Sequence, residues 1–191
     1  MRLITGALLV ILLAGCSTKM APMKTYTLQT TEVNNSYNAS YQNKTIQVMQ
    51  PQSLKEKMSE KIYFSYSPTQ QGAYLNSKWS NDLGTLVQGT LIHTLQSSGM
   101  FKGVVSYAST AQADYRLEST VFDFSHHVRG NASHAIVSIQ FDLISTDTGK
   151  LIKSKRFSYM EATGTTDAEG YVKASNMAIE RLSKDLLLWL K

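Results

Sequence analysis

The chain has 191 residues, a formal net charge of +5 at pH 7 and one cysteine. A chain of this length is long enough for one globular domain with a proper core, and a single cysteine excludes an internal disulfide. The positive excess is small and scattered, which argues against a nucleic-acid-binding protein. The densest basic stretch, residues 153–156, has strand spacing and is interpreted as a solvated edge.

The first sixteen residues have the pattern of a secretory signal sequence. Arg2 supplies a positive charge, residues 3–13 are almost entirely apolar, and the small residues Ala14 and Gly15 precede Cys16. The apolar stretch is too short to span a bilayer, which takes about 20 residues. Leu-Ala-Gly-Cys resembles the bacterial lipobox. That resemblance implies cleavage between Gly15 and Cys16, with diacylglycerol and an N-linked acyl chain on Cys16. The alternative is that Cys16 is an ordinary small residue at the end of a signal segment.

Such a covalent lipid would hold the protein on a membrane, and no other cofactor is predicted. Residues 1–15 are therefore expected to be a signal peptide, and residues 16–44 an acylated cysteine followed by a flexible polar tether. The tether is rich in Ser, Thr, Asn and Gln and buries too little apolar surface to compensate for ordering. Residues 24–28 alternate and are a candidate for a small strand. Asn34 lies in a bacterial glycosylation sequon with Glu32 two residues before it, and its occupancy is left open.

The remaining residues, 45–191, are expected to form a single globular domain. Alternating or clustered apolar residues predict strands, at residues 45–49, 62–66, 73–75, 104–105, 115–125, 137–143 and 151–161. The alternation slips at Val121 and Phe122, as a β-bulge would produce. Residues 125–131 are interpreted as a loop, and the turn at 146–149 joins the last two strands in an antiparallel hairpin.

Two helices are predicted beside these strands. One follows Trp79, is capped by one of residues 80–82 and ends at Gly99. The other is capped by Thr166-Asp167 and has one apolar face over about five turns. Two main helices packed on one face of a largely antiparallel sheet define an α+β two-layer sandwich.

Several blocks of this sequence together resemble one family. They are the lipobox, the polar segment, and residues 74–79, 98–104, 113–117, 147–152 and 189–190. The chain is identified from them as similar to the ABC-type transport auxiliary lipoprotein components, which include the paraquat-inducible protein C lipoproteins. The resemblance implies a lipoprotein of the Gram-negative envelope. It also implies partners, namely ABC transporters and their substrate-binding proteins of the mammalian-cell-entry type, which move phospholipid or other apolar solutes between the two membranes.

The sequence offers little for catalysis or metal binding. It contains neither a Gly-x-x-x-x-Gly-Lys-Ser/Thr phosphate loop nor a Gly-x-Ser-x-Gly nucleophile elbow, so we expect no enzyme. His126 and His127 are adjacent, and on a strand they would point to opposite faces, which disfavours a shared metal. A loop that carries His126, His127 and Arg129 is a candidate for partner contact. Trp79 is another candidate, with packing of the helix start as the alternative.

Two functions remain in view. The first is a membrane-anchored lipoprotein that docks the periplasmic mammalian-cell-entry-type component of an ABC transporter, whose ATPase supplies the energy; direct carriage of phospholipid is a variant. The second is an outer-membrane adaptor that binds a cell-wall synthase or another envelope assembly machine. Ser17 stands where Asp is the usual inner-membrane retention signal in enteric bacteria. The expected location is therefore the inner leaflet of the outer membrane, with the domain in the periplasm.

Overall fold

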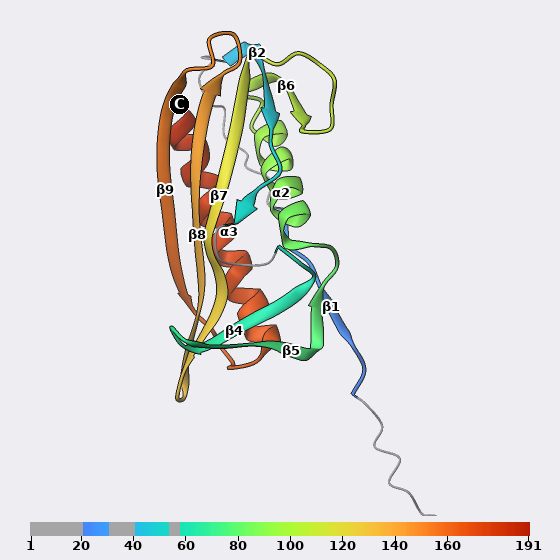
Figure 1. The fold of residues 1–191 in the computed structure, drawn as a ribbon, viewed down its shortest axis with the longest axis vertical. Coiled ribbons are helices and arrows are strands. Elements are labelled where there is room, and N and C mark those ends of the chain that lie inside the picture. Colours follow the sequence, from blue (N-terminus) through green and yellow to red (C-terminus); the bar gives the residue numbers. More distant parts are fainter. Residues whose placement is uncertain (1–20, 31–40, 54–57) are drawn as a thin grey trace, which may run out of the picture.

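The computed structural model describes residues 21–30, 41–53 and 58–191 (Figure 1). Cys16, Ser17 and Asn34 lie outside the described residues. The described part contains two helices, α2 (Leu83–Ser97) and α3 (Ala168–Leu190), and nine strands in one sheet. The strands are β1 (Lys24–Tyr26), β2 (Tyr41–Val48), β3 (Gln52–Ser53), β4 (Lys61–Ser67), β5 (Gln70–Trp79), β6 (Phe101–Ser106), β7 (Tyr115–Arg129), β8 (Ala132–Ser145) and β9 (Leu151–Ala162).

The sheet is organised around β7. Strand β7 pairs with β8 in an antiparallel hairpin, and β8 pairs in the same sense with β9. On its other edge β7 pairs in parallel with β2, β3 and β4, one after another along its length. Strands β4 and β5 are antiparallel, while β1 joins β5 and β6 joins β2 in parallel. The antiparallel pairings include most of the paired residues, which confirms the predicted α+β class and adds five short parallel pairings to it.

Both helices cover the same face of the sheet (Figure 1), as the sequence predicts. The side chain of Asp82 caps α2 by accepting from the amide of Thr85 at 2.9 Å, and Asp167 caps α3 through the amide of Gly170 at 2.9 Å. The core combines alternate residues of β7, β8 and β9, the apolar faces of α2 and α3, and single buried residues of the shorter strands such as Ile46 and Ile62. Its central members are fully buried: Leu91, Leu95, Leu117, Ile139, Phe141, Leu143 and Leu186.

The predicted bulge and the predicted hairpin turn at 146–149 are confirmed, and a second hairpin turn joins β7 to β8. The β7–β8 register shifts between Val121 and Asp123, which leaves Phe122 as the extra residue. Gly130 and Gly149 have φ angles of 57° and 67° in the two turns, a conformation that glycine adopts without steric cost. The predicted loop at 125–131 is wrong, because β7 continues through Arg129. Residues 125–129 pair with β8 on one side, and His126 and His127 pair with Phe64 and Ser65 of β4 on the other.

The ordered body begins within the segment that we expected to be a tether. Strand β1 pairs with the end of β5, and Leu28 is buried in the core. The amide of Gln29 donates to Oδ1 of Asn176 on α3 at 2.8 Å. The alternation of residues 24–28 therefore reflects a real strand. It places folded structure only eight residues after Cys16 in the sequence.

Candidate functional site

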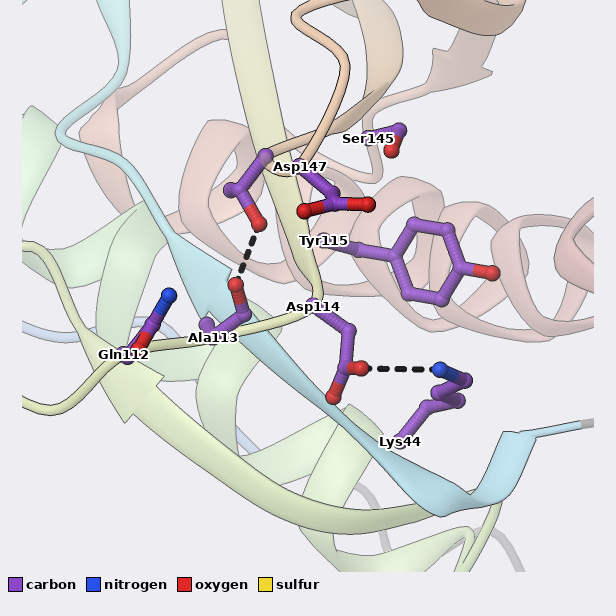
Figure 2. A pocket seen from close by; sticks show the side chains of 8 residues that line it. Lys44, Gln112, Ala113, Asp114, Tyr115, Ser145 and Asp147 are labelled. Atoms are coloured by element: carbon purple, nitrogen blue, oxygen red, sulfur yellow. Dashed lines mark hydrogen bonds and ion pairs between the residues drawn. The ribbon is translucent and has the colours of Figure 1, made fainter.

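An open polar hollow of about 510 Å³ lies at one end of the long axis. It forms where the starts of β2 and β7 meet the turn between β8 and β9 (Figures 1 and 2). We call it the polar end hollow. Its main polar lining residues come from three separate parts of the sequence: Lys44, Asp114, Tyr115, Ser145, Thr146 and Asp147.

Asp114 holds the three segments of this hollow together. Its carboxylate accepts from the amide of Thr45 at 2.8 Å. It also accepts from Nζ of Lys44 at 2.9 Å (Figure 2). Its own amide donates to the carbonyl of Thr45 at 3.0 Å, and its carbonyl accepts from the amide of Thr146 at 3.1 Å. The hydrogen bond from the Thr45 amide, followed by that from Lys44, lowers the pKa of Asp114 to about 2. Asp114 is thus a carboxylate at any physiological pH.

Besides Asp114, the residues that line the polar end hollow include Thr146, Asp147 and Lys44. The hydroxyl of Thr146 donates to the carbonyl of Ala113, so its role is to hold the turn against β7. Asp147 lies across the hollow from Lys44 (Figure 2). One ammonium and two carboxylates on a rigid frame suit recognition of a polar or charged group. In the described residues, no cluster of three or more His, Cys, Asp or Glu is placed to hold a metal ion.

The predicted contact residue His126 lies in an aromatic cluster near the other end of the molecule. Its ring is fully buried, with its centroid 6.1 Å from that of Tyr74 and 5.3 Å from that of Tyr171. Its Nδ1 lies 2.7 Å from the hydroxyl of Tyr74. Burial, only partly offset by the nearby Asp167 carboxylate, lowers the pKa of His126 to about 4. This histidine is therefore neutral and structural.

Trp79 belongs to the same cluster. Its indole is 1% exposed and packs edge-on against Phe124 and Tyr171. Burial of both Trp79 and His126 corrects the expectation that these two side chains contact a partner. The alternative that we gave for Trp79, packing at the helix start, agrees with this position.

The other two predicted contact residues remain partly exposed. Nε2 of His127 lies 3.3 Å from Oδ2 of Asp123, and the His127 side chain keeps about a third of its surface. Arg129 donates from Nη1 to the carbonyl of Ser65 at 3.1 Å, which ties β7 to β4. Because side chains alternate along a strand, His127 and Arg129 lie on the face of β7 opposite to His126.

A second hollow, of about 480 Å³ and largely apolar, lies at the end opposite the polar end hollow. It borders β4 and β5, and we call it the β4–β5 hollow. Sequence reasoning missed it. Leu75, on its rim, is 88% exposed, and Met23 is 55% exposed. Its lining includes Met23, Glu60, Lys61, Ala73, Leu75 and Lys78.

Comparison with known proteins shows the family of this chain. Residues 26–186 match the model of the ABC-type transport auxiliary lipoprotein component family. The chain belongs to that family, which is a family of envelope lipoproteins that assist transport and is not an enzyme class. No helix in the described residues has the length and apolar character needed to span a membrane. Among curated proteins, none is significantly similar to this chain in sequence.

Solved structures share the fold at low sequence identity. A protein from Xanthomonas campestris is 16% identical with a TM-score of 0.75, over 87% of this chain and 94% of that one. A second, uncharacterised protein is 17% identical with a TM-score of 0.69, over 90% of this chain and 100% of that one. A hypothetical protein from Chlamydia trachomatis is 8% identical with a TM-score of 0.53, over 78% and 95% of the two chains.

Proposed function

We propose that this protein is a lipid-anchored docking component of an ABC-type transport system in the Gram-negative envelope. Membership of the auxiliary lipoprotein family is the observation that carries the proposal. The partner is the periplasmic component of a mammalian-cell-entry-type transporter, and the cargo is phospholipid or another apolar solute. The partner's ATPase supplies the energy, because this sequence has no phosphate-binding loop of its own.

The anchor is a diacylglycerol and an N-linked acyl chain on Cys16, formed after cleavage at Gly15. The lipobox around Cys16 supports this, and multiple acyl chains bind a bilayer almost permanently. Ser17 in place of Asp favours the inner leaflet of the outer membrane. The domain then faces the periplasm.

The shape of the domain supports a division between a membrane end and a partner end. Strand β1, which follows the anchor, lies in the half of the molecule opposite the polar end hollow (Figure 1). In this arrangement Lys44, Asp114 and Asp147 face away from the membrane. A partner that spans the periplasm meets this end first. We therefore assign partner contact to the polar end hollow, with His127 and Arg129 outside it.

A photocrosslinking residue at position 147 tests the proposal in native envelopes. Position 147 lies in the β8–β9 turn at the polar end hollow, and position 131 in the β7–β8 turn is the matched control at the other end. Capture of a transporter subunit from position 147 and not from position 131 is the expected result. Capture of a cell-wall synthase from position 147 would replace the transport role with that of an envelope adaptor.

A further inference from the structure

We propose that the β4–β5 hollow rests on the surface of the same bilayer that holds Cys16, so that the domain lies against the membrane on this side. The inference deepens the proposed function and rests on acylation of Cys16. In this arrangement residues of the folded domain contact lipid in addition to the acylated Cys16. The occupant of the hollow is the headgroup region of an anionic phospholipid bilayer.

The length of chain between anchor and fold supports this occupant. Lys24, the first residue of β1, follows Cys16 by eight residues. An extended chain advances at most about 3.3–3.6 Å per residue, so β1 stays within about 30 Å of the lipidated cysteine whatever path the linker takes. Met23, which lines the hollow, lies one residue closer. The anchor thus holds this surface at high effective concentration next to the bilayer.

The apolar side chains at the hollow are of the kind that enter a membrane interface. Leu75 is 88% exposed and Met23 is 55% exposed, and both line the same hollow. A single exposed leucine is ordinary on a protein surface, but two large apolar side chains around a largely apolar hollow form a patch. Insertion into the boundary between headgroups and acyl chains removes such a patch from water.

The charges around the hollow complement anionic headgroups. Lys61 and Lys78 line it. Lys24 lies next to it on β1, with its Nζ 3.8 Å from Oε2 of Glu169. Glu60 is the acidic residue in the lining, and its carboxylate pairs with Nζ of Lys78 at 2.7 Å. None of the ion pairs among the described residues involves Lys61. Basic side chains near a bilayer are attracted by the negative surface potential of anionic lipid.

Tryptophan fluorescence of the acylated full chain on vesicles tests the inference. Leu75→Trp places a reporter on the hollow, and Leu188→Trp, at a residue that is 60% exposed on α3, is the matched control. The vesicles contain phosphatidylethanolamine and phosphatidylglycerol in a 3:1 ratio, with and without brominated acyl chains. Trp79 and Trp189 contribute the same background to both variants. Both substitutions replace exposed side chains and should leave the fold intact.

Vesicle-bound Leu75→Trp should show a blue-shifted emission and at least twofold stronger quenching by brominated lipid than Leu188→Trp. Adding Lys61→Glu to Leu75→Trp should reduce that quenching. Equal quenching of the two reporters on vesicle-bound protein would overturn the inference while leaving the anchor intact. A blue shift without vesicles that grows with protein concentration would also overturn it, in favour of a second copy of the chain. An intact mass without lipid on Cys16 would overturn both this inference and the proposed anchor.

Discussion

The hydroxyl of Tyr74 lies 2.7 Å from Nδ1 of His126 and joins β5 to β7 inside the aromatic cluster. His126 is fully buried there, and within the described residues its Nε2 has no hydrogen-bond partner. A charged imidazolium at this place would have to give up its hydration without a compensating carboxylate in contact. The cluster therefore holds His126 neutral, with its pKa lowered by burial to about 4.

The lowered pKa of His126 predicts that the protein loses stability in mild acid. In the unfolded chain the histidine has an ordinary pKa near 6.5, so the unfolded state takes up the proton first as the pH falls. The free energy of unfolding should therefore be highest above pH 6.5. It should fall by about 3 kcal/mol between pH 6.5 and pH 4, at about 1.36 kcal/mol per pKa unit.

Urea denaturation at several pH values between 7.5 and 4 measures this loss. His126→Gln should be less stable than the wild type at pH 7.5 and should show a flatter dependence on pH. His127→Gln, at the partly exposed neighbour, is the matched control for the loss of an imidazole. A wild-type slope in the His126→Gln variant would contradict the assignment.

Substitution of Asp114 should lower the stability of the fold more than substitution of Asp147, although both carboxylates line the polar end hollow. Asp114→Asn weakens the contacts to the amide of Thr45 and the ammonium of Lys44, which hold the start of β2 against β7. We expect its melting temperature to fall by a few degrees, while Asp147→Asn melts as the wild type does. Thermal unfolding followed by circular dichroism compares the two variants. Equal melting temperatures would show that the Asp114 contacts do not stabilise the fold.

Trp79 should behave as a core residue. Trp79→Ala removes a fully buried indole from contact with Phe124 and Tyr171, and should cost about 3–5 kcal/mol of unfolding free energy. Leu75→Ala, on the same strand but exposed, should change it by no more than about 0.5 kcal/mol. Chemical denaturation gives both values. A loss below about 1 kcal/mol for Trp79→Ala would contradict its place in the core.

Two helical glycines should respond in opposite directions to alanine. A Cβ atom on Gly170 would lie 2.3 Å from the carbonyl oxygen of Thr165, so Gly170→Ala forces the entry to α3 to shift and should be destabilising. A Cβ on Gly89 meets nothing within 4 Å, so Gly89→Ala in α2 should stabilise by about 0.5–1 kcal/mol. We expect the urea midpoint of Gly89→Ala to lie above that of the wild type and the midpoint of Gly170→Ala to lie below it. Two midpoints on the same side would contradict it.

Local patterns account for the parts of the fold that the sequence predicts well. The caps Asp82 and Asp167, the bulge at Phe122 and the β8–β9 hairpin each depend on neighbouring residues, and each is found in the structure. The parallel pairings of β2, β3 and β4 with β7 join segments far apart in the sequence, and periodicity does not encode them. Pairing with β4 and β8 is what makes residues 126–129 a strand.

The candidate sites were harder to predict for the same reason. The polar end hollow combines Lys44, Asp114 and Asp147, which no sequence spacing connects. His126 and Trp79 carry side chains that are common at interfaces, yet both serve the core. Leu75 gives no signal in the sequence, since an apolar residue on a strand is normally assigned to the buried face. Its exposure becomes visible only once the fold of β5 is known.

Purification of the acylated full-length protein from native envelopes in mild detergent, followed by mass spectrometry of the bound proteins, tests the central claim most directly. We predict that a mammalian-cell-entry-type protein or a permease subunit elutes with it, and that Cys16→Ser, which removes the anchor, reduces this recovery. Elution with cell-wall enzymes instead, or with no specific protein even after crosslinking, would contradict a role in transport.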